Sequence, residues 1–203
     1  SLEESLTRLG KESIEIAYIH DADNWVREAI DVVYPELHKM RNEGLVKAIG
    51  IGMNWCPTSV AIMKETDLNI ALIAGRFTLL DQSAQVELYP LALAKKVSII
   101  AAGVFNSGVL ANPVEGAYYD YEIASQEIID KARAIAKFLE KFSVTLASAA
   151  LQFPLRHPAV ASVLTGAGST AELQANIASF DATLPDELWS EMEEAGLIST
   201  LPN

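Results

Sequence analysis

Short apolar stretches alternate along the chain with longer stretches in which apolar residues recur every three or four positions. The short stretches predict β-strands, and the longer ones predict helices that bury one face. The predicted strands cover residues 14–20, 46–53, 70–77, 97–104 and 160–165. The predicted helices cover residues 25–42, a segment that begins near 57, and residues 86–96, 125–142, 146–156, 171–180 and 185–195. The pattern therefore predicts a repeated strand–helix unit.

This order predicts an α/β fold with a parallel sheet, because each helix must return the chain to the end of the sheet where the next strand begins. The nearly continuous apolar strands favour a sheet that is covered on both faces. Both an open doubly wound sheet and part of a (β/α)8 barrel fit this description. The Gly-x-Gly-x-x-Gly sequence of Rossmann domains is absent, because no third glycine follows Gly50 and Gly52 at the required spacing.

Composition narrows the class of protein. The 203 residues are 50% hydrophobic, which is enough for the core of one domain. Asp and Glu number 27 against 15 Lys and Arg, and the net charge of −12 excludes nucleic acid and anionic membrane surfaces as expected partners. The single cysteine, Cys56, allows no internal disulfide, and we see neither a signal peptide nor the roughly 18 apolar residues of a membrane span. We therefore expect a cytoplasmic protein.

Candidate chemistry is sought at the carboxyl ends of the predicted strands, where parallel α/β proteins bind their ligands. The residues at these positions are His20, Asn54, Arg76 to Asp81, Phe105-Asn106-Ser107-Gly108 and Gly166-Ala167-Gly168-Ser169.

Each candidate has a structural alternative. His20 is either a site residue or a hydrogen-bonded histidine at a strand end. The segment 166–170 is either a phosphate site at a helix N-terminus or an ordinary N-cap, in which Ser169 and Glu172 form a capping box. Arg76 pairs either with a substrate or, more commonly, with a neighbouring acid in an exposed salt bridge.

Two further features favour a structural role. Ser107-Gly108 is compatible with a simple tight turn. Asp21 and Asp23 are better explained as loop-capping carboxylates than as metal ligands, because no second histidine or cysteine lies nearby. We expect no metal site.

Several separated segments carry a family resemblance. They are LTRLG (6–10), IAYIHD (16–21), GLVKAIGIG (44–52), RFTLLDQ (76–82), FNSGVL (105–110) and AALQFPL (149–155). With these segments in this order, the whole chain resembles the aldo-keto reductases, most closely their aldose dehydrogenase branch. The resemblance implies a (β/α)8 barrel that binds NAD or NADP and transfers a hydride between nicotinamide and a carbonyl or lactol carbon.

The resemblance also implies that residues 1–203 are the C-terminal part of such a barrel, about strands four to eight. His20 matches the histidine that orients the substrate oxygen. The family's catalytic Tyr, Lys and Asp belong to the missing N-terminal βα units, so we expect this chain alone to be inactive. A parallel barrel cut open leaves unpaired strand edges. We therefore expect either the missing segment or a second copy to cover them.

The cofactor positions match the family unevenly. Asn54 lies one place after the position of the asparagine that holds the nicotinamide carboxamide. Ala74 and Ala102 stand where the family has a glutamine and the aromatic residue that stacks on nicotinamide. The remaining implied cofactor residues match the family's pyrophosphate and adenosine positions and are Phe105, Asn106, Ser107, Gly108, Leu110, Gly166, Ala167, Gly168, Ser169 and Asn176.

Gly168 replaces an arginine that in many members pairs with the 2′-phosphate of NADP. The 2′-phosphate thereby loses a charge-assisted partner worth roughly 1.5–3 kcal/mol, which favours NAD. The leading prediction is an NAD(P)-dependent oxidoreductase that acts on an aldose or a similar small carbonyl compound. The alternatives are a non-catalytic nucleotide-binding or assembly module built on a partial barrel, and a structural dimer that binds no ligand.

Overall fold

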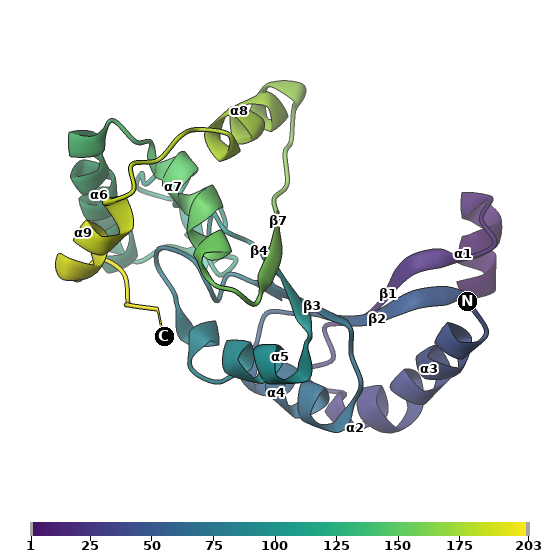
Figure 1. The fold of residues 1–203 in the computed structure, drawn as a ribbon. Coiled ribbons are helices and arrows are strands. Elements are labelled where there is room, and N and C mark those ends of the chain that lie inside the picture. Colours follow the sequence, from purple (N-terminus) through teal and green to yellow (C-terminus); the bar gives the residue numbers. More distant parts are fainter. Residues whose placement is uncertain (1, 202–203) are drawn as a thin grey trace.

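The computed structural model describes residues 2–201, in which strands and helices alternate (Figure 1). One parallel sheet has the strand order β1-β2-β3-β4-β7, formed by β1 (Ile14–His20), β2 (Val46–Met53), β3 (Ile70–Ala74), β4 (Ser98–Ala102) and β7 (Val160–Leu164). A small antiparallel pair consists of β5 (Tyr118–Tyr119) and β6 (Glu122–Ile123). The α/β class and all five predicted strands are confirmed.

The helices follow the strands in the predicted order. The α-helices are α1 (Leu2–Leu9), α2 (Val26–Glu28), α3 (Tyr34–Asn42), α4 (Cys56–Glu65), α5 (Leu88–Lys95), α6 (Gln126–Leu139), α7 (Leu146–Gln152), α8 (Thr170–Phe180) and α9 (Leu188–Glu194). Shorter helical segments are the π-helix η1 (Ala29–Val33) and the 3-10 helices η2 (Ser83–Gln85), η3 (Glu140–Phe142) and η4 (Phe153–Arg156). No helix within residues 2–201 is long and apolar enough to cross a membrane.

The helix predicted over 25–42 is helical throughout 26–42 but contains the π-helix η1. Pro35 lies at the start of α3, directly after this segment. Proline has no N–H to donate, and its ring clashes with the carbonyl four residues earlier in a regular α-helix. A wider π turn before Pro35 accommodates the ring, which explains why a continuous α-helix was the wrong expectation here.

Two strands are shorter than predicted, because a glycine turns the chain out of the sheet after each. Gly75 follows β3 with φ +72°, and Gly103 follows β4 with φ +60°. Gly75 donates its N–H to Ala102 O at 2.9 Å, so the two turns pack side by side. The apolar residues after Gly75 that extended the predicted strand, such as Phe77 and Leu79, are buried in a loop instead.

The two faces of the sheet differ in burial. Ile49, Ile51, Ile73 and Ile99 are fully buried on one face, which α3, α4 and α5 contact. Figure 1 shows these helices along one side of the strands. On the other face of the sheet, Leu164 is exposed. Most residues of β1, β3 and β4 that point to this face are partly exposed as well. The expectation of a sheet covered on both faces is therefore not met within residues 2–201.

Among the described residues, the sheet has two open edges. β1 pairs only with β2, and β7 pairs only with β4. Beside the β7 edge, α8 has no buried residue, and its apolar side chains Leu173, Ile177 and Phe180 are largely exposed. α8 contacts α7, yet these apolar side chains stay 43% to 54% exposed, which indicates a surface that another part of a protein covers.

Candidate functional site

The carboxyl ends of the five strands lie along one edge of the sheet. The parallel register pairs His20 with Gly52, Ala74 with Ala102, and Ala102 with Leu164. The residues that follow the strands therefore line one continuous rim, as expected for ligand-binding positions in a parallel sheet. We call this edge the strand-end rim.

His20 is the last residue of β1, and 73% of its side chain is exposed at the rim. Its Nδ1 lies 3.2 Å from Oδ2 of the adjacent, exposed Asp21. Opposite it, a Cβ on Gly52 would lie 3.0 Å from His20 Cδ2, so the absence of a side chain makes room for the imidazole. Asp21 lies on the Nδ1 side of the ring, and Nε2 lies on the other side.

The segment after β4 forms the expected tight turn. Asn106, Ser107 and Gly108 all have positive φ values, and Phe105 O accepts hydrogen bonds from Gly108 N at 3.0 Å and Leu110 N at 3.1 Å. Leu110 is fully buried in the core and Phe105 is half-buried against it. Any ligand contact from these two residues must therefore come largely through the backbone.

Asn106 is 3% exposed and holds two turns together. Its Nδ2 donates to Gly75 O at 3.3 Å, whereas its buried Oδ1 has no hydrogen-bond partner. An unpaired buried acceptor costs free energy comparable to a lost hydrogen bond, and such groups in native proteins commonly await a water or a ligand.

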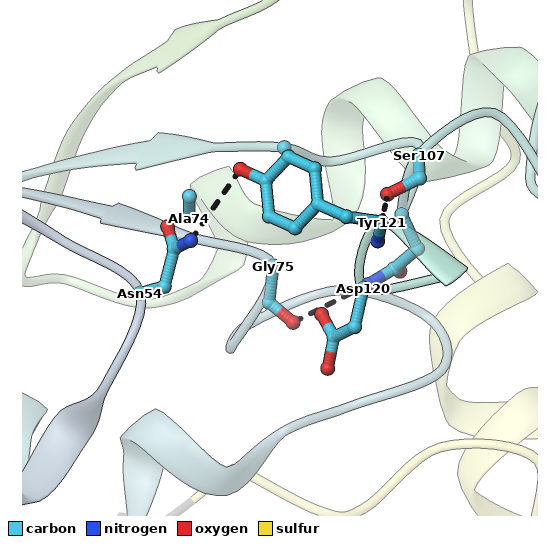
Figure 2. A pocket seen from close by; sticks show the side chains of 8 residues that line it. Asn54, Ala74, Gly75, Ser107, Asp120 and Tyr121 are labelled. Carbon is cyan, nitrogen blue, oxygen red and sulfur yellow. Dashed lines mark hydrogen bonds between the residues drawn. The ribbon is translucent and has the colours of Figure 1, made fainter. Parts of the chain in front are cut away.

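A small cavity of about 30 Å³ lies at this point of the rim (Figure 2). It brings together three sequence-predicted residues, Asn54, Asn106 and Ser107, and its other lining residues are Ala74, Gly75, Gly103, Asp120 and Tyr121. A volume of this size accommodates one water-sized group. His20 and the residues of the β7–α8 segment do not line it.

Asp120 and Tyr121 were missed by the sequence analysis. They form the turn of the β5–β6 hairpin, residues 118–123, with φ values of 49° and 68°. Tyr121 N donates to Ser107 Oγ at 3.3 Å, and Asn54 Nδ2 donates to Tyr121 Oη at 3.4 Å (Figure 2). One signal in the sequence could have indicated this turn. Asp120 stands among three tyrosines, and aspartate tolerates the left-handed backbone region that a tight turn needs.

Arg76 connects the β5–β6 hairpin to the strand-end rim through ion pairs and a hydrogen bond. Its Nη1 lies 2.8 Å from Asp120 Oδ2 and 3.2 Å from Asp81 Oδ2, and its Nε donates to Asn54 O at 2.8 Å. The guanidinium also lies 5.0 Å from the centre of the Trp55 ring. The prediction of a neighbouring acid is confirmed, but the expected exposure was wrong, since Arg76 is only 9% exposed.

The neighbouring carboxylates raise the pKa of Arg76 by more than burial lowers it. Burial lowers the pKa of Arg76, but the hydrogen bonds and ion pairs with Asp120 and Asp81 raise it, and the net pKa is above its ordinary value. Arg76 therefore stays charged and fixes both carboxylates.

The other end of the rim is formed by the β7–α8 segment, residues 165–176. Ser169 is the N-cap of α8, and its Oγ accepts from Glu172 N at 3.2 Å, which confirms the N-cap prediction. The Glu172 carboxylate accepts from Gly168 N at 2.7 Å and not from Ser169 N, so the reciprocal bond of the expected capping box is displaced by one residue. Asn176 Nδ2 donates to Gly166 O at 3.2 Å. The segment is thus held by local bonds, and the phosphate site stays a prediction.

Comparison with known proteins identifies relatives along nearly the whole chain. Residues 1–196 match the Aldo/keto reductase family. The chain is 37% identical to pyridoxal 4-dehydrogenase of Microbacterium luteolum over 210 residues, a match that covers 98% of this chain and 61% of that protein. It is 38% identical over 203 residues to D-threo-aldose 1-dehydrogenase of a Pseudomonas species, covering 98% of this chain and 62% of the relative.

A solved structure matches the fold. The holo form of aldo-keto reductase AKR11C1 from Bacillus halodurans superposes with a TM-score of 0.79 at 22% identity, covering 100% of this chain and 67% of that one. The parallel sheet and its helices thus have the arrangement of part of that reductase. The chain spans about three fifths of the length of the curated relatives named above.

Proposed function

The chain belongs to the aldo/keto reductase family, and from that premise we propose that it forms part of an NAD-dependent oxidoreductase acting on an aldose or a similar small carbonyl compound. Its relatives include proteins named pyridoxal 4-dehydrogenase and D-threo-aldose 1-dehydrogenase. The observation that carries the proposal is His20, exposed at the strand-end rim with its Nδ1 3.2 Å from Asp21 Oδ2.

His20 is the residue proposed to orient the substrate oxygen. The exposed ring offers Nε2 as the acceptor of a hydrogen bond from a substrate hydroxyl when the ring is neutral with its proton on Nδ1. When the ring is protonated, Nε2 donates to a carbonyl oxygen. The same side chain therefore serves either direction of the reaction.

The rim offers suitable groups for a nicotinamide dinucleotide. Asn54 supplies a side-chain amide at the rim, beside the buried side chain of Asn106. Ser107 and the N-terminus of α8 lie further along the rim as polar groups for the diphosphate and adenosine. The bound cofactor supplies hydride transfer, and this chain's residues bind and orient it.

NAD is proposed in preference to NADP. Gly168 offers no cation to a 2′-phosphate, and the Glu172 carboxylate lies 2.7 Å from Gly168 N. A carboxylate repels a phosphate but accepts hydrogen bonds from a ribose hydroxyl. Glu172 therefore adds to the argument that Gly168 makes from the sequence.

The complete enzyme is proposed to need a further segment. The family's proton-transferring Tyr, with its Lys and Asp, is assigned to N-terminal βα units outside these 203 residues, which are then the C-terminal part of the barrel. The open edges at β1 and β7 and the exposed apolar face of α8 support this arrangement. Either those units or a second copy would cover these surfaces, and the chain alone would be inactive.

The test measures the reduction of NAD by the full-length gene product with a panel of aldoses and with pyridoxal. The reaction is monitored by the absorbance of the NADH that forms. We expect His20→Ala to lower kcat/KM by roughly 100-fold, within the range of proton-transfer and orientation effects, while leaving the Kd for NADH unchanged. Asp23→Asn serves as a control in the same loop. Absence of both NADH binding and substrate oxidation in the wild-type protein would overturn the proposal.

A further inference from the structure

We propose that Gly52 is a positioning residue for His20. Because Gly52 has no side chain, the His20 imidazole lies over β2, and this placement sets where Nε2 meets the substrate oxygen. The inference rests on the proposed function, since it concerns the residue proposed to orient that oxygen. In this role Gly52 acts through His20 and not by binding a ligand.

The backbone of β2 does not require glycine at this position. Neither Gly50 nor Gly52 has a positive φ, unlike Gly75 and Gly103, which follow β3 and β4. Glycine weakens a strand, because it has no side chain to pack and loses the most conformational freedom on folding. A glycine inside a strand therefore marks a place where another group comes close to the backbone.

Each of these two glycines lies beside a ring of β1. The parallel register pairs Tyr18 with Gly50 and His20 with Gly52. A Cβ on Gly50 would lie 2.8 Å from two carbons of the Tyr18 ring and 2.7 Å from Ile70 Cγ2. A Cβ on Gly52 would lie 3.0 Å from His20 Cδ2 and 3.9 Å from its Nε2, and its three nearest atoms would all belong to His20. Both rings therefore use space that a side chain on β2 would fill.

The strands cannot move apart to make room for a larger residue at position 52. Asp21 N donates to Gly52 O at 3.0 Å, so the backbones of β1 and β2 are joined at this point. The residues on either side of Gly52, Ile51 and Met53, are buried on the opposite face of the sheet. The His20 side chain, in contrast, is 73% exposed. A side chain at position 52 therefore displaces the imidazole and not the strand.

Gly50 differs because its neighbours have less freedom to move. Tyr18 and Ile70 are both half-buried, and a Cβ at position 50 would meet both of them. A substitution at position 50 therefore strains the packing of the sheet, whereas a substitution at position 52 moves an exposed ring. Two glycines of one strand thus have different roles, one in stability and one in the geometry of His20.

The expected displacement is large enough to affect catalysis. Two carbon atoms have an optimal separation of about 3.5–4.0 Å, so a methyl group at position 52 pushes His20 Cδ2 away by roughly 0.5 Å or more. A misplacement of about 1 Å at a reacting centre can lower the rate about 100-fold. The effect should therefore increase with the size of the side chain at position 52.

The experiment uses the full-length gene product and measures kcat/KM for an aldose, the Kd for NADH and the urea midpoint. The variants are Gly52→Ala, Gly52→Val, His20→Ala, and the double variant of Gly52→Ala with His20→Ala. Gly50→Ala is the matched control, because it places the same methyl group on the same strand two residues earlier.

We expect Gly52→Ala to lower kcat/KM roughly tenfold and Gly52→Val roughly 100-fold. The Kd for NADH and the urea midpoint of Gly52→Ala should stay close to the wild-type values. In the His20→Ala background, Gly52→Ala should cause no further loss, because the ring that it displaces is absent. Gly50→Ala should lower the urea midpoint more, and kcat/KM less, than Gly52→Ala does.

NMR of the histidine ring protons provides a readout that does not depend on activity. The His20 signals are assigned by their loss in His20→Ala. Gly52→Ala should shift the His20 signals and leave those of His38 and His157 in place, since these two lie elsewhere in the chain. Unshifted His20 signals would contradict a displacement of the ring.

The outcomes separate the two proposals. Unchanged kcat/KM in both Gly52 variants, with His20→Ala impaired, would overturn the positioning role while the proposed function stands. A tenfold further loss when Gly52→Ala is added to His20→Ala would also overturn it, because the effect would not pass through His20. No substrate oxidation by the wild-type protein, or a His20→Ala variant as active as the wild type, would overturn the proposed function first.

Discussion

The two ends of the strand-end rim are built differently. At the hairpin end, Arg76 and Asn106 are buried and bond to groups 22 to 44 residues away in the chain. At the α8 end, no residue of α8 is buried, and the bonds of Glu172 and Asn176 reach only four and ten residues back. One end is part of the core, whereas the other is a surface turn.

Because of this difference, we expect the hairpin end of the rim to be rigid and the α8 end to tolerate substitution. Buried polar groups with several partners have a single arrangement, because each lost partner leaves a costly unpaired group. The hairpin end is therefore fixed before any ligand binds, as a site for ring chemistry requires. The α8 end can change its side chains at little cost in stability, and is the place where cofactor preference can be altered.

The largest expected effect comes from a matched pair of truncations. Leu79, in the loop that follows Arg76, is fully buried, whereas Leu173 on α8 is half-exposed. Leu79→Ala should lower the free energy of unfolding by about 3 kcal/mol, because it leaves a cavity in the core. Leu173→Ala should lower it by less than about 1 kcal/mol. Urea denaturation of both variants measures the difference.

Comparable losses in the two leucine variants would contradict the contrast between a core-like end and a surface-like end. Arg27→Met tests an exposed counterpart of the buried Arg76. Like Arg76, Arg27 pairs with two carboxylates, those of Asp31 and Glu65, but it lies at an exposed position. It should leave the urea midpoint close to that of the wild type.

A smaller effect is expected from a charge reversal at the α8 end. Glu172→Arg replaces the carboxylate beside Gly168 with a cation that can pair with a 2′-phosphate. The ratio of the Kd values for NADP and NAD should fall roughly tenfold or more, with little change in stability. Glu172→Gln should give a smaller fall in the same direction. An unchanged ratio in both variants would show that this position does not choose the cofactor.

The smallest effect concerns pH. His157 packs against Phe77 and Tyr89 and is almost fully buried, which lowers its pKa. The unfolded chain therefore takes up a proton first, near the ordinary value of about 6.5. The contribution of neutral His157 is present above that pH and is lost as the pH falls below it, down to the folded-state pKa.

His157→Asn keeps a polar acceptor for Ala159 N–H but does not titrate, since His157 Nδ1 accepts that bond at 3.1 Å in the wild type. Urea midpoints between pH 7 and pH 5 should fall less steeply in this variant than in the wild type. An equal or steeper fall would show that His157 does not contribute to acid sensitivity.

Much of the fold was predictable because strands and helices have different hydrophobic periods. The strands 14–20 and 46–53 agree with β1 and β2 to the residue. The strand ends at Ala74 and Ala102 were missed, because a glycine with positive φ ends a strand even where apolar residues continue. The apolar loop after Gly75 cannot be told from a strand by its composition.

The candidate site could be predicted only where a single polar residue directly follows a strand. His20 and Asn54 could be placed from the order of strands and the family resemblance. The pairing of Arg76 with Asp120 could not, because Asp120 lies 44 residues away and reaches Arg76 through a hairpin with two left-handed residues. Long-range polar pairs depend on the folded arrangement, which a local pattern does not contain.

The most direct test of the central claim, that the strand-end rim binds a nicotinamide dinucleotide, is a crystal structure of the protein soaked with NADH. We predict electron density along the rim, with the nicotinamide beside His20 and Asn54 and the adenosine beside Gly168 and Glu172. Density for NADH elsewhere on the protein, or density in the reverse orientation with adenine beside His20, would contradict the account.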